Sequence, residues 1–171
     1  MSRRKNVPLI VRAFSDLVRN HDVNAKLVLA GTPGNDSARV SQLISTLGIG
    51  ERVVNLGYVE EEQLREVIGG SLAFIFPSFY EGFGLPIIEA MSQGVPAITT
   101  KLTATAEIGR QGALFVDAND ETELMRTMLR LIQNESERIQ IGRDGIDISK
   151  KYQWKETARR VFHLIDSVLD Q

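Results

Sequence analysis

Two glutamates separated by a loop rich in glycine are the residues of this sequence best suited to chemistry. They bound the segment Glu81–Glu89, which reads EGFGLPIIE and follows an apolar run. Gly82 and Gly84 allow backbone conformations and a close backbone approach that other residues do not. Pro86 is tolerated in the first turn of a helix, where its missing amide hydrogen has no partner to lose. The segment therefore predicts a helix that begins near Leu85.

The start of that helix predicts an anion site. Its first amide groups have no partner inside the helix, and they coincide with the positive end of the helix dipole, an arrangement that suits a diphosphate. Glu89 lies about one turn into the helix, roughly 6 Å along the axis from Leu85, whereas Glu81 lies in the preceding loop. The two carboxylates can thus flank one ligand without lying side by side. That separation favours hydrogen bonds to sugar hydroxyls over the sharing of a proton.

Five short apolar runs, each predicted to be a strand, alternate along the chain with segments of helical period. The runs are Lys26–Ala30, Val53–Gly57, Leu72–Pro77, Ala97–Thr100 and Ala113–Val116. Each is apolar on both faces, as buried parallel strands are, and the alternation is typical of crossover units. We therefore predict an α/β fold with an open parallel sheet and helices on both faces. Ligands of such sheets lie outside the carboxyl ends of the strands, where Leu72–Pro77 meets the two glutamates.

The end of the chain is predicted to be helical, over Arg138–Lys150 and then Lys155–Leu169. The second of these helices carries an apolar face that includes Phe162 and Ile165, so it is expected to dock on another element. Trp154 opens this helix, and we interpret it as a packing anchor rather than a platform for a stacked base.

Composition limits the class of protein. The chain has 171 residues, of which 43% are hydrophobic and 25% are charged, so we expect one globular domain over residues 1–171. The net charge is −2, with both signs scattered along the chain, so the clustered basic surface that nucleic acid requires is missing. No apolar run approaches the roughly 20 residues of a membrane span. We therefore expect neither a nucleic-acid partner nor a segment that spans a membrane.

Metal and redox chemistry are not expected either. The sequence contains no cysteine, which excludes disulfides and thiolate ligands and fits a reducing compartment, so the cytoplasm is the expected location. His21 and His163 have no carboxylate or histidine at metal-ligand spacing. We expect no metal site and no cofactor.

The glutamate segment, extended to Glu81–Pro96, closely resembles the two-glutamate motif of the group 1, or family 4, glycosyltransferases of the GT-B fold. Arg4–Asn6 at the start of a helix, Leu27–Gly31, Val53–Val59 and Gly112–Asp117 are also similar to the carboxyl-terminal domain of that family. The resemblance covers nearly the whole chain. It implies a Rossmann-like domain that forms one half of a GT-B fold, binds a nucleoside-diphospho-sugar and transfers its sugar with retention of configuration.

The resemblance also implies roles for individual residues. Glu89 would bind the ribose hydroxyls of the nucleotide, while Glu81 would face the donor sugar. Lys5 looks like the family's lysine that neutralises the donor diphosphate, which an ammonium group can do in a site without metal. The rest of the implied donor-binding loop is Gly82, Phe83, Gly84 and Leu85, the last two offering backbone amides.

Two further residues lie at strand ends, and two roles are possible for each of them. Ser78 could contact the ligand or serve in an ordinary turn. Tyr58 could lie near the nucleotide base or be a partly buried aromatic.

The sequence departs from the family pattern in two places. The proline that similar proteins often carry before the residue equivalent to Glu107 is missing. In the family, a strand and an arginine precede the loop that holds Lys5, and that strand lies between the equivalents of Lys26–Ala30 and Leu72–Pro77. We therefore hypothesise that the chain is a fragment, or a product read from an internal start, and that it either is marginally stable alone or completes its sheet with another chain. The family's arginine and its amino-terminal domain, which binds acceptor, are expected to be missing as well.

Two other functions were weighed against glycosyl transfer. A sugar-nucleotide epimerase of the same overall fold would need acid and base residues mostly outside this segment. A non-catalytic module that binds nucleotide-sugars is the second alternative. A nicotinamide-binding domain fits poorly, because no Gly-x-Gly-x-x-Gly run follows a predicted strand. The base, the sugar and the acceptor cannot be read from the sequence.

Overall fold

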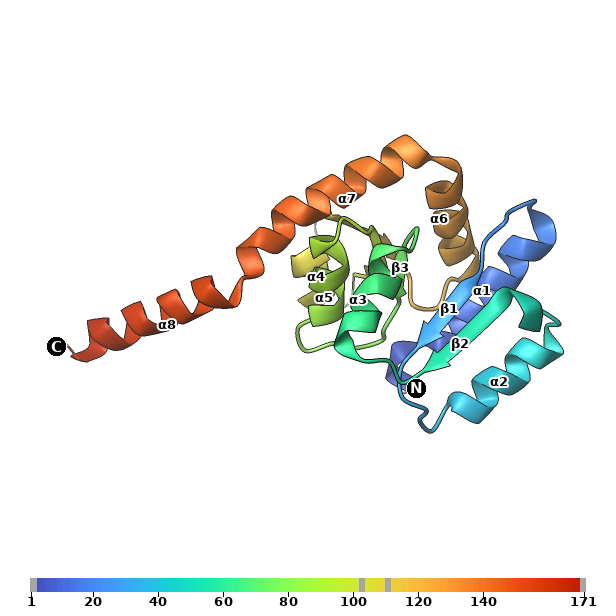
Figure 1. Cartoon of the computed structure of the whole chain (residues 1–171), viewed down its shortest axis with the longest axis horizontal. Coiled ribbons are helices and arrows are strands. Elements are labelled where there is room, and N and C mark those ends of the chain that lie inside the picture. The colour runs from blue at the N-terminus through green and yellow to red at the C-terminus, as the bar shows by residue number, and fades with distance from the viewer. Residues whose placement is uncertain (1–2, 102–103, 110–111, 170–171) are drawn as a thin grey trace.

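The computed structural model describes residues 3–101, 104–109 and 112–169, in which helices and strands alternate as predicted (Figure 1). The elements in chain order are η1 (Arg3–Lys5), α1 (Val7–Asn20), β1 (Leu27–Ala30), α2 (Ser37–Thr46), η2 (Gly50–Arg52), β2 (Val53–Gly57), α3 (Glu61–Gly69), β3 (Phe74–Phe76), α4 (Leu85–Ser92), β4 (Ala97–Thr100), α5 (Ala104–Gly109), β5 (Ala113–Val116), α6 (Glu121–Gln133), α7 (Glu135–Ser149), η4 (Lys150–Tyr152) and α8 (Trp154–Leu169).

The predicted strands are confirmed, and two of them are shorter than predicted. Three of them, β2, β4 and β5, have the predicted ends, but β1 begins at Leu27 and β3 covers only Phe74–Phe76. Both shorter strands begin where their neighbour does, since Leu27 pairs with Val53 and Phe74 pairs with Ala97. The sequence shows where apolar runs lie, whereas the partner strand decides where pairing starts.

The strands form two parallel sheets rather than the single sheet predicted from the sequence. One sheet has the order β1-β2 and the other has the order β3-β4-β5. Within the described ranges, β2 is the only strand that pairs with β1, and β4 is the only strand that pairs with β3. The division lies where the resemblance placed a further strand, as expected from the departure noted in the sequence, and no described strand joins β1 to β3.

Helices cover both faces of the β3-β4-β5 sheet. Ile98 of β4 packs in one apolar cluster with Phe14 of α1 and Leu124 of α6. The preceding residue, Ala97, packs in another cluster with Met91 of α4 and Ile108 of α5. Successive side chains of a strand point to opposite faces, so α1 and α6 lie on one face and α4 and α5 on the other. This α/β arrangement confirms the predicted fold class.

The last helix, α8, extends away from the body (Figure 1). Its apolar residues, among them Phe162 and Ile165, are exposed, so the expected docking contact is not present in the part of the chain that the structure describes. Trp154 is 77% exposed, and its interpretation as a packing anchor is therefore wrong. The helix leaves η4 pointing away from the other elements, and its apolar face is exposed among the residues that the structure describes.

The polar face of α8 is linked by ion pairs within the helix. Glu156 accepts hydrogen bonds from Arg159 and Arg160, and these bonds lower the pKa of the Glu156 carboxyl to about 2. The two arginines are exposed and Glu156 is half-buried at the surface, so the pairs support the helix locally and contribute little to the stability of the fold. No helix in the described ranges combines the length and the apolar character that crossing a bilayer requires.

Candidate functional site

The helix start predicted after the third strand is present. The chain leaves β3, passes through the glutamate loop and enters α4 at Leu85, with Gly84 as the N-cap residue at φ 99° and ψ 35°. Pro86 lies in the first turn, and the amide of Ile87 donates to the carbonyl of Gly84 at 2.9 Å. Buried side chains of α4 hold the helix against the sheet. Its amino-terminal end is therefore fixed at the carboxyl end of β3.

Only one of the two loop glycines has a backbone conformation that requires glycine. Gly84 adopts a positive φ, and a Cβ placed there would lie 3.4 Å from Cγ2 of Thr105. Gly82 has no positive φ, and a Cβ there would meet nothing within 4 Å. The argument from glycine's conformational freedom is thus confirmed for Gly84, whereas Gly82 adopts no positive φ, and a close approach of its backbone to a ligand stays a prediction.

The Gly84→Ala substitution is expected to destabilise the protein by about 1–2 kcal/mol, because an L-residue in the left-handed region costs that much. The melting temperature should fall by roughly 2–6 °C for a chain of this size. Gly82→Ala is the matched control, and it should change stability by less than about 0.5 kcal/mol. Thermal unfolding of the two variants checks this, and equal melting temperatures would contradict the conformation described for Gly84.

A buried carboxylate and two cations form the charged centre of the site. Glu81 is 7% exposed. Lys5 donates a hydrogen bond from Nζ to Oε1 of Glu81 at 2.9 Å, and a guanidinium nitrogen of Arg4 lies 3.6 Å from Oε2. The Lys5 ammonium also lies 4.0 Å from the ring centroid of Phe76 in β3. The structure therefore brings Lys5 and Glu81 together, although they are 76 positions apart in the chain.

Asn6 anchors the segment that carries these cations. Its backbone is left-handed at φ 54°, and its side-chain amide donates to the carbonyls of Pro77 at 3.3 Å and Ala118 at 2.7 Å. The amide of Phe79 donates to the carbonyl of Arg4 at 3.0 Å. These bonds attach the start of the chain to the loops that follow β3 and β5.

Sequence reasoning assigned no role to Asn6 or Arg4. The available signal for Asn6 was its residue type directly before a helix, since asparagine favours N-cap positions and tolerates the left-handed region. Arg4, directly before Lys5, lies against the same carboxylate as Lys5. The arginine of the family pattern precedes this loop, so its expected absence stays a prediction.

The other predicted residues lie in three places. Glu89 is exposed on α4, in the turn after Leu85. Ser78 is 2% exposed, and its hydroxyl has no hydrogen-bond partner in the described part of the chain. Phe83 is half exposed and meets Tyr152 edge-on at 6.1 Å. Tyr58 follows β2, in the other sheet, and is 64% exposed, so its partly buried interpretation is wrong.

The charged centre and the start of α4 together suit an anionic ligand. Two cations meet one carboxylate, and the free amides of a helix start lie at the same end of the sheet. In the described ranges, no group of three or more histidine, aspartate or glutamate side chains is arranged to hold a metal ion. The positive groups identified at this site therefore come from Lys5, Arg4 and the helix start.

Comparison with known proteins agrees with this geometry. The model of the family "Glycosyl transferases group 1" matches residues 1–147. The chain belongs to the group 1 glycosyltransferases. It is also 33% identical over 156 residues to the O-antigen chain mannosyltransferase B of Escherichia coli, covering 91% of this chain and 41% of that protein. This glycosyltransferase chain thus spans less than half of that relative.

Solved structures show the same fold. HepE of Anabaena, in complex with UDP-glucose, has a TM-score of 0.86 with this chain at 19% identity, covering 98% of this chain and 46% of HepE. The C-terminal domain of the group 1 protein LpcC from Francisella tularensis has a TM-score of 0.79 at 20% identity, covering 90% of this chain and 83% of that domain. The glycosyltransferase chain therefore has the fold of one half of a GT-B protein.

The departure noted after β4 falls partly outside the described residues, since positions 102–103 are among those not described. Beyond them, Thr105 donates from its hydroxyl to the carbonyl of Thr100 at 2.6 Å, and Glu107 is exposed on α5. Without the family's proline, this threonine bond ties the start of α5 to the end of β4.

Proposed function

We propose that this chain binds the donor, a nucleoside-diphospho-sugar, for a glycosyltransferase that retains anomeric configuration. The observation that carries the proposal is the charged centre of Lys5, Arg4 and Glu81 beside the start of α4. Such a site offers both fixed cations and free backbone amides to a diphosphate. Membership of the group 1 family and the likeness to a structure solved with UDP-glucose support this assignment.

In this proposal, Lys5 and the amides at Gly84 and Leu85 hold the diphosphate. The acceptor hydroxyl attacks the anomeric carbon, the bond from that carbon to the phosphate oxygen breaks, and the diphosphate departs with the bonding electrons. Negative charge grows on the diphosphate in the transition state, so fixed cations and amides stabilise that state more than the ground state. Retention follows if the acceptor attacks from the face that the diphosphate leaves.

Glu81 then has a structural and a binding role. Its carboxylate is held by Lys5 and Arg4. A bound diphosphate would compete for the Lys5 ammonium, leaving Glu81 to accept hydrogen bonds from the donor sugar. We assign it no role as a nucleophile, and we assign the site no metal and no cofactor.

Acceptor binding is proposed to come from polypeptide outside this chain. The chain spans 41% of its Escherichia coli relative, and it matches a carboxyl-terminal domain over 83% of that domain. We propose that residues 1–171 are one donor-binding domain and that an amino-terminal domain closes the other side of the cleft.

Calorimetry with a panel of nucleosides, nucleoside diphosphates and their sugar conjugates tests the proposal. We expect one nucleoside diphosphate to bind, its sugar conjugate to bind as well, and the free nucleoside to bind far more weakly. Failure of every diphosphate in the panel to bind would overturn the proposal.

Lys5→Met is expected to weaken diphosphate binding about 10- to 100-fold, because a hydrogen bond to a charged group contributes about 1.5–3 kcal/mol. Binding of the free nucleoside should not change. Lys155→Met, at an exposed position of α8, is the matched control. Because Lys5→Met removes a partner from a buried carboxylate, the double variant Lys5→Met with Glu81→Gln and the melting temperatures separate lost binding from lost folding. Diphosphate affinity that is the same in Lys5→Met and wild type would contradict the role given to Lys5.

A further inference from the structure

The side chain of Asn6 joins the carboxyl ends of two strands that are not neighbours in their sheet. Asn6 is 7% exposed, and its Nδ2 atom donates to the carbonyl of Pro77, after β3, at 3.3 Å and to that of Ala118, after β5, at 2.7 Å. The sheet order β3-β4-β5 places β4 between these two strands. The Asn6 amide therefore spans the end of β4 and uses both of its N–H groups on buried carbonyls.

The position of Asn6 makes two demands that asparagine meets together. Its backbone is left-handed at φ 54°, a region that glycine and asparagine enter more readily than most residues. Both partners of its side chain are carbonyl oxygens, so the side chain must supply two N–H donors at short reach. Glycine meets only the backbone demand, and aspartate would place an acceptor against two acceptors. The side chain makes no cap bond to α1, so these two carbonyls, and not the helix start, account for asparagine here.

The same two bonds fix the backbone from which the Lys5 side chain extends. Lys5 directly precedes Asn6 at the end of η1. Its Nζ lies 2.9 Å from Oε1 of Glu81 and 4.0 Å from the ring centroid of Phe76. Both partners belong to β3 or to the loop that follows it, and so does the carbonyl of Pro77 that accepts from Asn6. Asn6 therefore holds the backbone of Lys5 in place relative to both partners of the ammonium.

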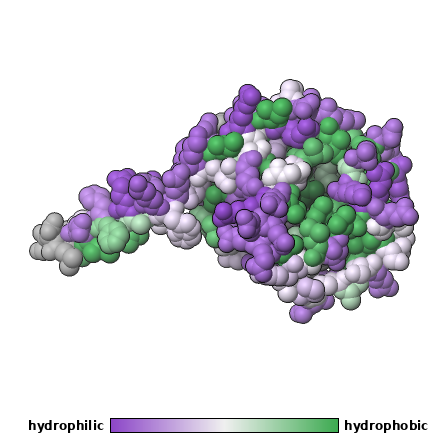
Figure 2. Space-filling view, viewed as in Figure 1, coloured by the Kyte–Doolittle hydropathy of each residue, from purple (hydrophilic) through white to green (hydrophobic). Residues whose placement is uncertain are grey.

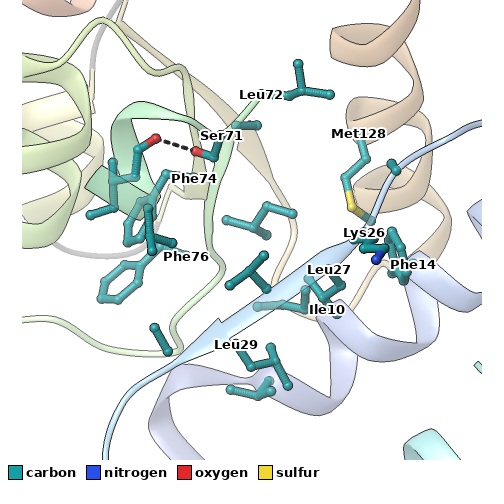
Figure 3. A pocket seen from close by; sticks show the side chains of 18 of the residues that line it. Ile10, Phe14, Lys26, Leu27, Leu29, Ser71, Leu72, Phe74, Phe76 and Met128 are labelled. Carbon is teal, nitrogen blue, oxygen red and sulfur yellow. Dashed lines mark hydrogen bonds between the residues drawn. The ribbon is translucent and has the colours of Figure 1, made fainter. Parts of the chain in front are cut away.

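The Lys5 side chain has room to leave that position. It borders a cavity of about 640 Å³ between β1 and β3, and Figure 3 shows Phe76 of β3 and Leu29 of β1 on opposite sides of this space. From outside, the cavity forms a hydrophobic hollow (Figure 2). Its described lining residues include no carboxylate. A lysine stem is long and flexible, so packing on this side does not confine the ammonium, and its location depends on where the backbone is held.

Two successive carbonyls after β3 are held by side chains from different segments. The carbonyl of Pro77 accepts from Asn6, whereas that of Ser78 accepts from Oγ1 of Thr100 at 2.9 Å. Thr100 ends β4 and is 1% exposed, so its bond is as buried as that of Asn6. Loss of either bond should loosen the loop after β3, but only loss of Asn6 also releases the segment that carries Lys5. Thr100 therefore provides a matched comparison.

We propose that Asn6 is a positioning residue for donor binding, which holds the Lys5 ammonium where it can neutralise the diphosphate. The Asn6 side chain does not touch the donor, and its effect on affinity passes through Lys5. A cation that is already in place strengthens binding, because less ordering remains to be done when the ligand arrives. The part of this inference that concerns the diphosphate rests on the proposed function, whereas the effect of Asn6 on Lys5 does not.

Acetylation of lysines, followed by mass spectrometry, tests the effect on Lys5 without a ligand. Asn6→Gly keeps the left-handed backbone but removes both side-chain bonds. Acetic anhydride should label Lys5 in this variant at least about 3-fold faster than in the original chain, because the ammonium leaves its buried carboxylate more often. Lys155, at an exposed position of α8, should be labelled at the same rate in both proteins. Thr100→Val should lower the melting temperature without raising the labelling of Lys5.

Binding of UDP and GDP, measured by calorimetry, tests the effect on the diphosphate. The nucleotide that binds the original chain should bind Asn6→Gly about 5- to 20-fold more weakly, while the affinity for its nucleoside stays the same. In a Lys5→Met background, Asn6→Gly should cause no further loss, because its effect passes through Lys5. A merely structural role of Asn6 would weaken binding in both backgrounds.

Asn6→Ser, which keeps one donor, is the milder variant should Asn6→Gly unfold, and its Lys5 labelling should be intermediate. Labelling of Lys5 that neither Asn6 variant changes, an equal rise in Thr100→Val, or the full loss of affinity in the Lys5→Met background would each overturn the proposal. Failure of both UDP and GDP to bind the original chain would instead contradict the proposed donor function, and the labelling rates would still decide whether Asn6 positions Lys5.

Discussion

Replacing Glu89 by alanine is expected to weaken nucleotide binding about 10- to 100-fold. Glu89 is exposed, but it lies on α4, whose buried side chains hold the helix against the sheet. Its carboxylate is therefore presented from a fixed backbone one turn after the helix start. In the proposed site it accepts hydrogen bonds from the ribose hydroxyls, and such bonds to a charged acceptor contribute about 1.5–3 kcal/mol. Calorimetry with the nucleoside diphosphate chosen from the panel measures the loss.

A ligand without the ribose hydroxyls isolates this interaction. The 2′,3′-dideoxy form of the same nucleotide should bind the original chain weakly, and Glu89→Ala should not weaken it further, because the bond is already missing. Glu62→Ala, at an exposed position of α3, is the control for loss of surface charge. Equal affinity of Glu89→Ala and the original chain for the ribose nucleotide would rule out the proposed role.

Local features of the site could be predicted from the sequence. The start of α4 could be predicted from Pro86 and Gly84. Gly84 is the N-cap residue, and its positive φ is a conformation that few other residues adopt. These signals act within a few residues, so they do not depend on the contacts that the rest of the chain makes. Strands were found for a similar reason, because runs apolar on both faces fit only a buried position in a parallel sheet.

Contacts between distant segments could not be predicted from the residues alone. The Lys5–Glu81 pair and the bonds from Asn6 to Pro77 and Ala118 depend on where separate loops meet at the end of the sheet. The expected docking of α8 failed for the opposite reason. Its apolar face is a local property of the helix, but whether another element covers it depends on polypeptide that the helix itself does not specify.

Gly142→Ala is expected to destabilise the chain by about 2 kcal/mol and to lower its melting temperature by roughly 4–8 °C. A Cβ at this position of α7 would overlap the carbonyl oxygen of Gly94 and lie 3.0 Å from its carbonyl carbon. Alanine favours a helix over glycine by about 1 kcal/mol, but overpacking against backbone costs about 1–3 kcal/mol or more. Steric overlap should dominate because Gly94 cannot easily move. Its amide donates to the carbonyl of Met91 at 3.0 Å, where the chain turns from α4 toward β4.

Gly145→Ala separates the steric cost from the gain in helix propensity. It makes the same substitution in the same helix, but its Cβ would lie 3.3 Å from Cβ and Cγ of Met91 and 3.5 Å from its Cα, whereas at Gly142 it would lie 2.1 Å from a carbonyl oxygen. The milder contact requires a shift of only a few tenths of an ångström, so stability should change by less than about 1 kcal/mol. Thermal unfolding of both variants measures the difference, and a melting temperature of Gly142→Ala at or above that of Gly145→Ala would contradict the close contact of α7 with Gly94. Since α7 packs along α4, the helix that carries Glu89, a confirmed loss would support a contribution of this contact to the stability of the fold around the proposed donor site.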